Sequence, residues 1–306
     1  MVYLFSMVYS HVPVMLAEIL EYLAPKTGGK FIDCTLGGAG YTVALGEKVG
    51  KKGKVLGIDL DSLAIENAKR LLAEHHLDNV ILVQSNFENL SVAVKNNFPA
   101  GTLFDGIVFD LGLSSAQLDD ETRGFSFKGD RPLDMAFGPD QKQSSVQIIN
   151  NYSLLELTDI FRLYGEEKRA YQIAKAVVNA RRQKRIATTA DLVSIIESVI
   201  PFRFRSRIHP ATKIFQALRM ETNRELDVLS AVLPIASELL KPGGRIVVVS
   251  FHSGEDRIVK RFFKDNSQLG TGKLKILTKR PLVPGEKEIE NNPRARSAKL
   301  RAAEKI

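Results

Sequence analysis

The chain of 306 residues lacks the features of several common protein classes. Its one cysteine, Cys34, excludes an internal disulfide and a cysteine-based zinc cluster, and it favours a reducing compartment. No apolar run is long enough to span a membrane, and residues 1–7 have neither the basic flank nor the length of a signal peptide. We therefore expect a soluble, cytoplasmic protein without a metal site, with Met7 as an alternative start of translation.

The sequence also lacks the glycine spacing of a dinucleotide site. Glycines at 37, 38 and 40 follow the apolar run 31–34, but Val43 stands where the last glycine of G-x-G-x-x-G is needed, which argues against NAD. Asp59 follows a second apolar run, where its carboxylate could accept hydrogen bonds from both hydroxyls of a ribose. This looser pattern suits S-adenosylmethionine better, although an ordinary glycine-rich turn would also explain the glycines alone.

Positive charge is unevenly distributed along the chain, whose net charge is +8. Residues 1–110 hold 9 basic and 12 acidic residues, whereas residues 181–219 hold 9 against 2 and residues 273–306 hold 10 against 4. Two separate basic stretches favour a nucleic-acid substrate, and a solvated basic face is the alternative for each stretch alone.

The order of apolar runs predicts an α/β fold. Strand-like runs at 31–34, 54–59, 80–84 and 104–110 alternate with helical patterns at 41–48, 61–75 and 88–97, which is typical of a doubly wound parallel sheet. The next strand, 245–250, starts 135 residues after Asp110. Between them lie helical patterns at 145–151, 153–163, 166–183 and 189–199, and then one long helix at 214–240.

We therefore predict a Rossmann-like domain of residues 1–111 and 211–306, with an inserted helical domain of residues 112–210. A short edge strand is expected at 275–279.

Ligands of such sheets bind beyond the carboxyl ends of the strands, where several polar residues converge. Asp110 ends the apolar run 106–109 and is the strongest catalytic candidate, with a turn or helix cap as its alternative role. Phe87 could stack on an adenine or belong to the core. His252 could contact a base or a phosphate, or be structural. Ser253 and Asp256 predict a capping box for the helix that follows.

A second polar group precedes the predicted long helix. His209 and Arg219 are candidates for a substrate clamp, because a proline-started helix with an apolar face does not account for either residue.

Several motifs together resemble the bacterial small-subunit ribosomal RNA methyltransferase family that forms N4-methylcytidine in the decoding region, the MraW or RsmH family. The resemblance spans nearly the whole chain. It rests on His11-Val-Pro-Val-Met15, the loop 33–42, Asp110-Leu-Gly-Leu-Ser-Ser-Ala-Gln-Leu-Asp-Asp120, Arg123-Gly-Phe-Ser-Phe127, Pro132-Leu-Asp-Met135, Tyr164-Gly-Glu-Glu167, His209-Pro-Ala-Thr212, Ser250-Phe-His-Ser253 and Asn292-Pro-Arg-Ala-Arg-Ser297.

The resemblance implies a class I methyltransferase domain that uses S-adenosylmethionine, with a helical insertion for the substrate. It implies cofactor contacts from Ala39, Gly40, Tyr41, Asp59, Phe87, Asp110 and Gln117. Three positions depart from the family pattern: Tyr41 replaces histidine, Ala116 replaces proline and Gly254 replaces leucine. A backbone contact to the cofactor would survive the change at position 41, whereas an imidazole contact would not.

The implied reaction is methylation of the N4 amine of a cytidine in 16S ribosomal RNA, on the small subunit or on its free RNA. The acceptors that would orient this amine are Asp110, Ser114 and His252. A methyltransferase for another nucleic acid and a non-catalytic RNA-binding relative remain alternatives, and the sequence leaves a homodimer open. The DNA enzymes of this chemistry usually carry Asp/Ser/Asn-Pro-Pro-Tyr where this chain has Asp110-Leu-Gly-Leu.

Overall fold

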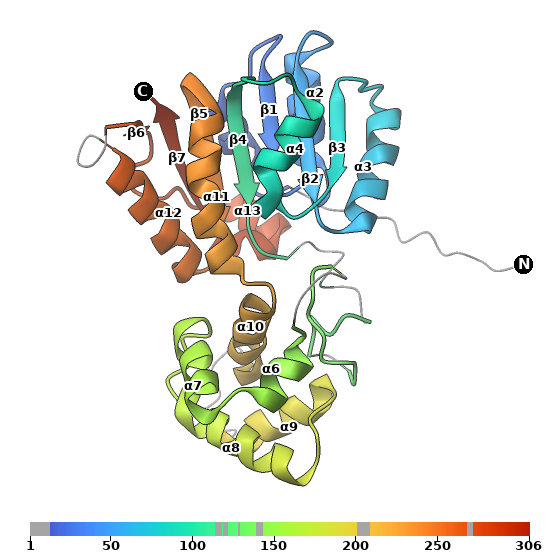
Figure 1. The fold of residues 1–306 in the computed structure, drawn as a ribbon, viewed down its shortest axis with the longest axis vertical. Coiled ribbons are helices and arrows are strands. Elements are labelled where there is room, and N and C mark those ends of the chain that lie inside the picture. The colour runs from blue at the N-terminus through green and yellow to red at the C-terminus, as the bar shows by residue number, and fades with distance from the viewer. Residues whose placement is uncertain are drawn as a thin grey trace, which may run out of the picture. The chain divides into compact units, whose positions relative to one another are not determined.

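The computed structural model describes residues 13–113, 118, 122–127, 129–138, 143–200, 209–267 and 272–306. The chain forms two compact units, Met1–Ser114 with Asp227–Ile306 and Ser115–Leu226 (Figure 1). The second unit corresponds to the predicted insertion but extends further, because it includes residues 211–226, which we expected in the first domain. In the described residues, no helix has both the length and the apolar character needed to cross a membrane.

A mixed sheet forms the centre of the first unit. Within the described residues its order is β3-β2-β1-β4-β5-β7-β6. The first five strands pair in parallel, whereas β7 is antiparallel to both β5 and β6. The strands are β1 (Lys30–Asp33), β2 (Lys54–Asp59), β3 (Val80–Gln84), β4 (Phe104–Asp110), β5 (Leu240–Ser250), β6 (Leu274–Ile276) and β7 (Lys299–Lys305). The sequence did not predict β7, and β6 is shorter than the expected strand at 275–279.

Helices cover both faces of this sheet, as its buried parallel strands require. In Figure 1, α4 and α11 cross the front of the sheet. The helices and 3-10 turns of this unit are α1 (Leu16–Leu23), α2 (Gly40–Val49), α3 (Ser62–Glu74), η1 (Phe87–Asn89), α4 (Leu90–Asn97), α11 (Glu225–Leu239), α12 (Ser253–Asn266), α13 (Glu286–Asn291) and η3 (Pro293–Ser297).

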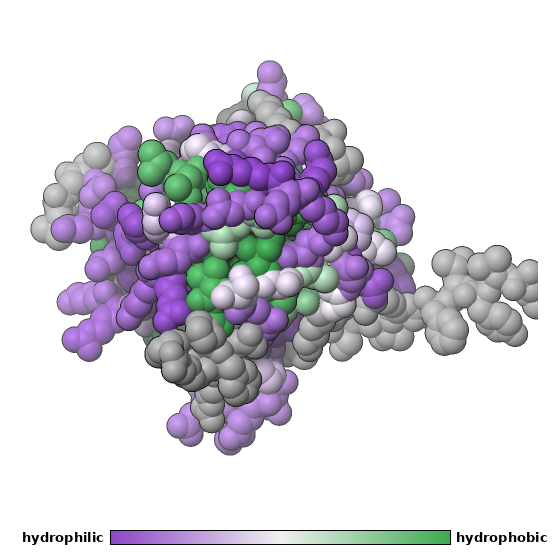
Figure 2. Space-filling view, turned by 90° about the horizontal axis from the view of Figure 1, so that it is seen from below, coloured by the Kyte–Doolittle hydropathy of each residue, from purple (hydrophilic) through white to green (hydrophobic). Residues whose placement is uncertain are grey.

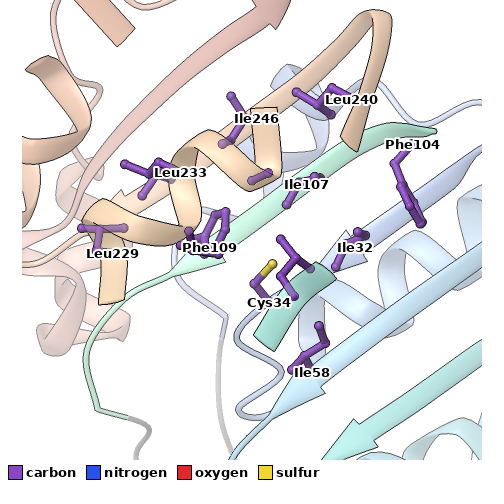
Figure 3. Packing of buried hydrophobic residues seen from close by; sticks show 14 of the residues in the cluster. Ile32, Cys34, Ile58, Phe104, Ile107, Phe109, Leu229, Leu233, Leu240 and Ile246 are labelled. Carbon is purple, nitrogen blue, oxygen red and sulfur yellow. The ribbon is translucent and has the colours of Figure 1, made fainter. Parts of the chain in front are cut away.

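Alternate residues of each strand belong to different cores, because successive side chains of a strand point to opposite faces. Ile32 and Phe109 pack with Leu229 and Leu233 of α11 in one core (Figure 3), whereas Phe31 packs with α1 and α2 in the other. The first core also holds Cys34, which is 1% exposed and serves as a small core residue.

The second unit is helical. Its described helices are α6 (Ser145–Asn151), α7 (Leu154–Leu163), α8 (Ala170–Gln183), α9 (Thr189–Val199) and α10 (Pro210–Thr222). Capping boxes formed by Ser144, Ser153 and Thr188 begin α6, α7 and α9, so local sequence fixes where these helices start. Hydrophilic residues predominate on the face of the molecule in Figure 2, with hydrophobic residues gathered near its centre.

The predicted long helix at 214–240 is wrong, because two separate helices, α10 and α11, take its place and the chain turns between them. Asn223 ends α10, and Arg224 adopts a left-handed conformation with φ 50°. The side chain of Asn223 donates to the carbonyl of Met135 at 2.8 Å and accepts from the amide of Phe137 at 2.8 Å. These bonds tie the helix end to a neighbouring loop of the same unit.

Candidate active site

Aspartates end three adjacent strands of the first unit. Asp33 ends β1, Asp59 ends β2 and Asp110 ends β4, and β1 lies between the other two strands in the sheet. Because parallel strands end at the same edge of a sheet, these three carboxylates lie at one edge; the sequence analysis expected Asp59 and Asp110 there and did not consider Asp33.

Asp33 organises the loop that follows β1. Its Oδ2 accepts from the Thr42 hydroxyl at 2.8 Å, and its Oδ1 accepts from the amide of Thr35 at 3.2 Å. The side chain is fully buried, and burial raises its pKa to about 6. Asp33 therefore joins the strand end to the first turn of α2.

Asp59 holds the glycine loop from the neighbouring strand. Its Oδ2 accepts from the amide of Gly37 at 2.8 Å, and its Oδ1 accepts from the amide of Asp61 at 2.9 Å. Gly37 has φ 45°, a conformation that glycine adopts without strain. Burial raises the pKa of Asp59 to about 6. A carboxylate has about four acceptor sites, so Asp59 can still accept from a ribose hydroxyl beside its backbone donors.

The turn from this loop into α2 is tightly packed. A Cβ atom on Gly40 would lie 2.7 Å from Cγ of Pro13, so this position requires glycine. Ala39 is fully buried and Tyr41 is 2% exposed. The Tyr41 hydroxyl is engaged inside the protein, 2.6 Å from the carbonyl oxygen of Val14. The cofactor contacts of Ala39, Gly40 and Tyr41 stay predictions of the family resemblance.

Of the three described carboxyls at these strand ends, Asp110 has the pKa that is raised furthest. Its Oδ2 lies 3.1 Å from the Tyr41 hydroxyl, and its Oδ1 is buried without a hydrogen-bond partner in the described part of the chain. Its own amide donates to the Thr35 hydroxyl at 2.6 Å. Burial, with Asp33 and Glu255 as negative neighbours, raises the pKa of Asp110 to about 8. This carboxyl is therefore largely protonated at neutral pH and carries an unused oxygen.

His252 caps the helix that follows β5. Its Nδ1 accepts from the amides of Gly254 and Glu255 at 3.0 and 3.4 Å, and its Nε2 lies 3.2 Å from Oε1 of Glu255. The capping box is therefore formed by His252 and Glu255. The predicted box of Ser253 and Asp256 is wrong by one residue. Sequence reasoning missed Glu255, whose signal was its position three residues after His252.

Asp256 has a different role from the predicted one. Its carboxylate accepts from Nε of Arg301 at 2.6 Å, which joins α12 to β7. The partner is 45 residues away, so no local pattern could have identified it.

The other predicted site residues are placed as follows. Phe87 is half-buried and packs edge-on against Phe109, with ring centroids 5.8 Å apart. Its ring therefore has a core partner, which is the alternative to stacking on an adenine. Ser114 and Gln117 lie outside the described residues.

The predicted clamp residues have structural partners inside the second unit. His209 caps α10 by accepting from the amide of Ala211 at 3.2 Å, and its ring stacks on Phe127 at 4.9 Å. Arg219 forms a bidentate pair with Glu225 at 2.7 and 2.8 Å. Capping and ion pairing account for both residues.

The charge of the strand-end site fits a cationic ligand. Asp33, Asp59, Asp110 and Glu255 bring four carboxyls together, and the pKa of Asp110 is raised in part by its acidic neighbours. The sulfonium and ammonium groups of S-adenosylmethionine would complement the charge of such a site. Oδ1 of Asp110 has no hydrogen-bond partner in the described residues. Asp59 would hold the ribose from its place beside the glycine loop.

This fold and this site define an S-adenosylmethionine-dependent methyltransferase. Comparison with known proteins identifies the particular family: the model of the MraW methylase family matches residues 8–306, and the chain belongs to that family.

Two curated relatives are similar over nearly their whole length. The protein from Thermomicrobium roseum named ribosomal RNA small subunit methyltransferase H is 45% identical over 311 residues, covering 97% of this chain and 94% of its own. The protein of the same name from Carboxydothermus hydrogenoformans is 45% identical over 316 residues, with 98% and 99% covered. A solved rRNA methylase from Streptococcus thermophilus is 11% identical with a TM-score of 0.47, and the match covers 97% of this chain and 99% of that one.

Proposed function

We propose that the protein methylates the N4 exocyclic amine of a cytidine in the decoding region of 16S ribosomal RNA. The family and the names of the relatives support ribosomal RNA of the small subunit as the substrate. The resemblance of the site motifs to N4-cytidine enzymes supports the atom and the region.

When bound, S-adenosylmethionine supplies a methyl group on a positively charged sulfur, which is already a strong electrophile. A cytosine amine is a poor nucleophile, because its lone pair is delocalised into the ring. The protein therefore has to hold the amine in line with the methyl group, and such positioning can contribute up to about 7–11 kcal/mol of a barrier.

The observation that carries this proposal is Oδ1 of Asp110, which is buried and has no hydrogen-bond partner in the described residues. An acceptor at this point can take a hydrogen bond from the amine, turn its lone pair towards the methyl group and stabilise the positive charge that develops. Oδ2 is already beside the Tyr41 hydroxyl, so Asp110 has one oxygen for one ligand group at a time. We therefore assign Asp110 an orienting role, and the proton of the alkylated amine leaves to solvent.

The remaining acceptor candidates differ in their availability. His252 uses Nδ1 in its cap, where it accepts from the amide of Gly254, so the neutral ring carries its proton on Nε2. Nε2 is buried without a hydrogen-bond partner in the described part of the chain and lies 3.2 Å from Oε1 of Glu255, so it can donate to a base but does not accept from the amine. Ser114 remains a proposed acceptor on the basis of the resemblance.

We assign RNA binding chiefly to the second unit. Arg182, Lys184 and Arg185 are exposed at and after the end of α8, where they can contact phosphates. Exposed Arg294 and Arg296 provide a second basic segment on the first unit. Because the target base must leave its stack to reach a strand-end site, single-stranded or splayed RNA is the expected form of the substrate.

The test is transfer of a labelled methyl group from S-adenosylmethionine to purified small ribosomal subunits and to naked 16S RNA, followed by nucleoside analysis. Labelled N4-methylcytidine is the expected product. A different methylated nucleoside, or no transfer to either substrate by a protein that binds the cofactor, would overturn the assignment. Comparison of the two substrates shows whether the assembled particle is required.

A further inference from the structure

The hydroxyl of Tyr41 has two acceptors and one proton. Its oxygen lies 2.6 Å from the carbonyl oxygen of Val14 and 3.1 Å from Oδ2 of Asp110. A phenol can donate only one hydrogen bond at a time. While Asp110 is neutral, the shorter contact marks Val14 as the acceptor. An ionised Asp110 is the stronger acceptor, because hydrogen bonds to charged groups are about twice as strong.

The Val14 carbonyl is fixed by its neighbours and cannot follow the hydroxyl. The amide of Met15 donates to Oε1 of Glu288 at 2.6 Å, which ties this segment to α13. Pro13 packs against Gly40, and Val14 and Met15 are 3% and 1% exposed. The Tyr41 hydroxyl can thus turn between these two acceptors by rotation about its C–O bond, without movement of the ring.

In the described residues, the charges that act on this pair are acidic, and His252 lies beside one of them, Glu255. Asp33 on β1 and Glu255 on α12 disfavour the ionised form of Asp110. Asp33, and Glu288 on α13, also act on Tyr41. In the described residues, Tyr41 is therefore the hydrogen-bond donor that favours the charged carboxylate against burial and these neighbours.

We propose that Tyr41 is a positioning residue for Asp110: its single hydroxyl proton turns from the Val14 carbonyl to Oδ2 of Asp110 when the positive charge of the cofactor enters the site, which leaves Oδ1 for the amine. The acid O–H bond of Asp110 breaks in this step, and its proton passes to solvent. Cofactor binding is thereby coupled to the release of one proton. The proposal depends on cofactor binding and not on the RNA substrate. It concerns a position where this chain departs from the family histidine.

The experiment measures S-adenosylmethionine affinity by calorimetry from pH 6 to 9, in buffers of different ionisation enthalpy, for the wild type and Tyr41→Phe. Wild-type affinity is expected to rise with pH, with uptake by the buffer of up to one proton per cofactor below the pKa of Asp110. Tyr41→Phe removes the donor to the carboxylate, so its affinity at neutral pH should fall by about 10-fold or more. The increase of affinity with pH should occur at higher pH in Tyr41→Phe than in the wild type.

Two controls separate positioning from folding. Tyr152→Phe removes a hydroxyl that donates to Glu221 at 2.7 Å in the other unit, and it should bind the cofactor like the wild type. In an Asp110→Asn background, Tyr41→Phe should have no further effect on the pH profile. An unshifted profile in Tyr41→Phe would overturn the proposal, even if affinity fell uniformly. If Tyr41→Phe does not fold, the absence of proton release by the wild type would overturn it equally.

Discussion

The free energy of unfolding of Asp110→Asn, relative to that of the wild type, is expected to be higher at pH 8 than at pH 4 in the cofactor-free protein. The pKa of Asp110 is raised from 3.8 to about 8 in the folded protein, with burial as the largest cause. Between these values the unfolded chain releases this proton while the folded protein keeps it. The free energy of unfolding therefore falls as pH rises from about 4, and the whole penalty is present above pH 8.

The size of this penalty follows from the shift. Each pKa unit corresponds to 1.36 kcal/mol, so a shift of about 4 units sets an upper limit on the order of 5 kcal/mol. Solvent near the half-buried side chain reduces the value, and about 2 kcal/mol would still be measurable. Asparagine has no charge in this range. Any cost of its unpaired amide is the same at both pH values and cancels in the comparison.

The assay has to follow the first unit alone, because the two units can unfold separately. Urea unfolding with hydrogen-exchange readout of peptides from β4 gives the free energy for that unit at each pH. Asp191→Asn, in the second unit, is a control of opposite sign that is followed in peptides from α9 instead of β4, since the amide of Ala187 lowers the pKa of Asp191 and this stability is lost as pH falls. Identical pH dependence in the wild type and Asp110→Asn would refute the reasoning.

Three further substitutions test separate parts of the structure. Asp59→Ala should weaken S-adenosylmethionine binding by about 10-fold or more in calorimetry, and unchanged affinity would exclude the ribose contact. Gly40→Ala places a methyl group against Pro13, so we expect destabilisation of about 1–3 kcal/mol in thermal unfolding and weaker cofactor binding; wild-type behaviour would show that Pro13 moves freely. Asn223→Ala should destabilise the second unit by about 1–3 kcal/mol in urea with exchange readout of α10, and unaltered exchange would show that the bonds of Asn223 to Met135 and Phe137 do not hold the helix end.

The strands that were predicted with the right bounds contain a run of mainly apolar residues. β2, β3 and β4 have the expected bounds, because such runs between turn residues are typical of strands in a parallel sheet. β7 was missed because two alanines and four charged residues have low strand propensity. Its place in the sheet depends on distant contacts, such as the pair of Arg301 with Asp256.

The break between α10 and α11 was also invisible in the sequence. Neither glycine nor proline marks residues 222–225, and the apolar periodicity continues across them. The break is stabilised instead by bonds from Asn223 to a loop more than 80 residues earlier. A local pattern cannot report a partner at that distance.

Some residues of the candidate site could likewise be identified from the sequence, and others could not. Asp59 and Asp110 could be identified because each directly follows an apolar strand, and topology then places both at one edge. The residues that determine the protonation state of Asp110 could not be identified from the sequence. At the sequence level Tyr41 is only a departure from a family motif, and its second acceptor is the backbone carbonyl of a residue 27 positions away. Burial, which raises the pKa of Asp110, is a property of the folded protein alone.

The acidic site opposes folding and favours binding for the same physical reason. Carboxyls at buried strand ends destabilise the free protein, because each neighbour disfavours the charge of the others. A cationic cofactor removes that repulsion, so its binding should be strongest where the free protein is least stable. Selection for stability alone would replace Asp110 by a neutral residue, whereas the proposed reaction needs an acceptor at this point. The buried, partnerless oxygen is therefore consistent with a site kept for its ligand, since active sites often retain groups that reduce stability.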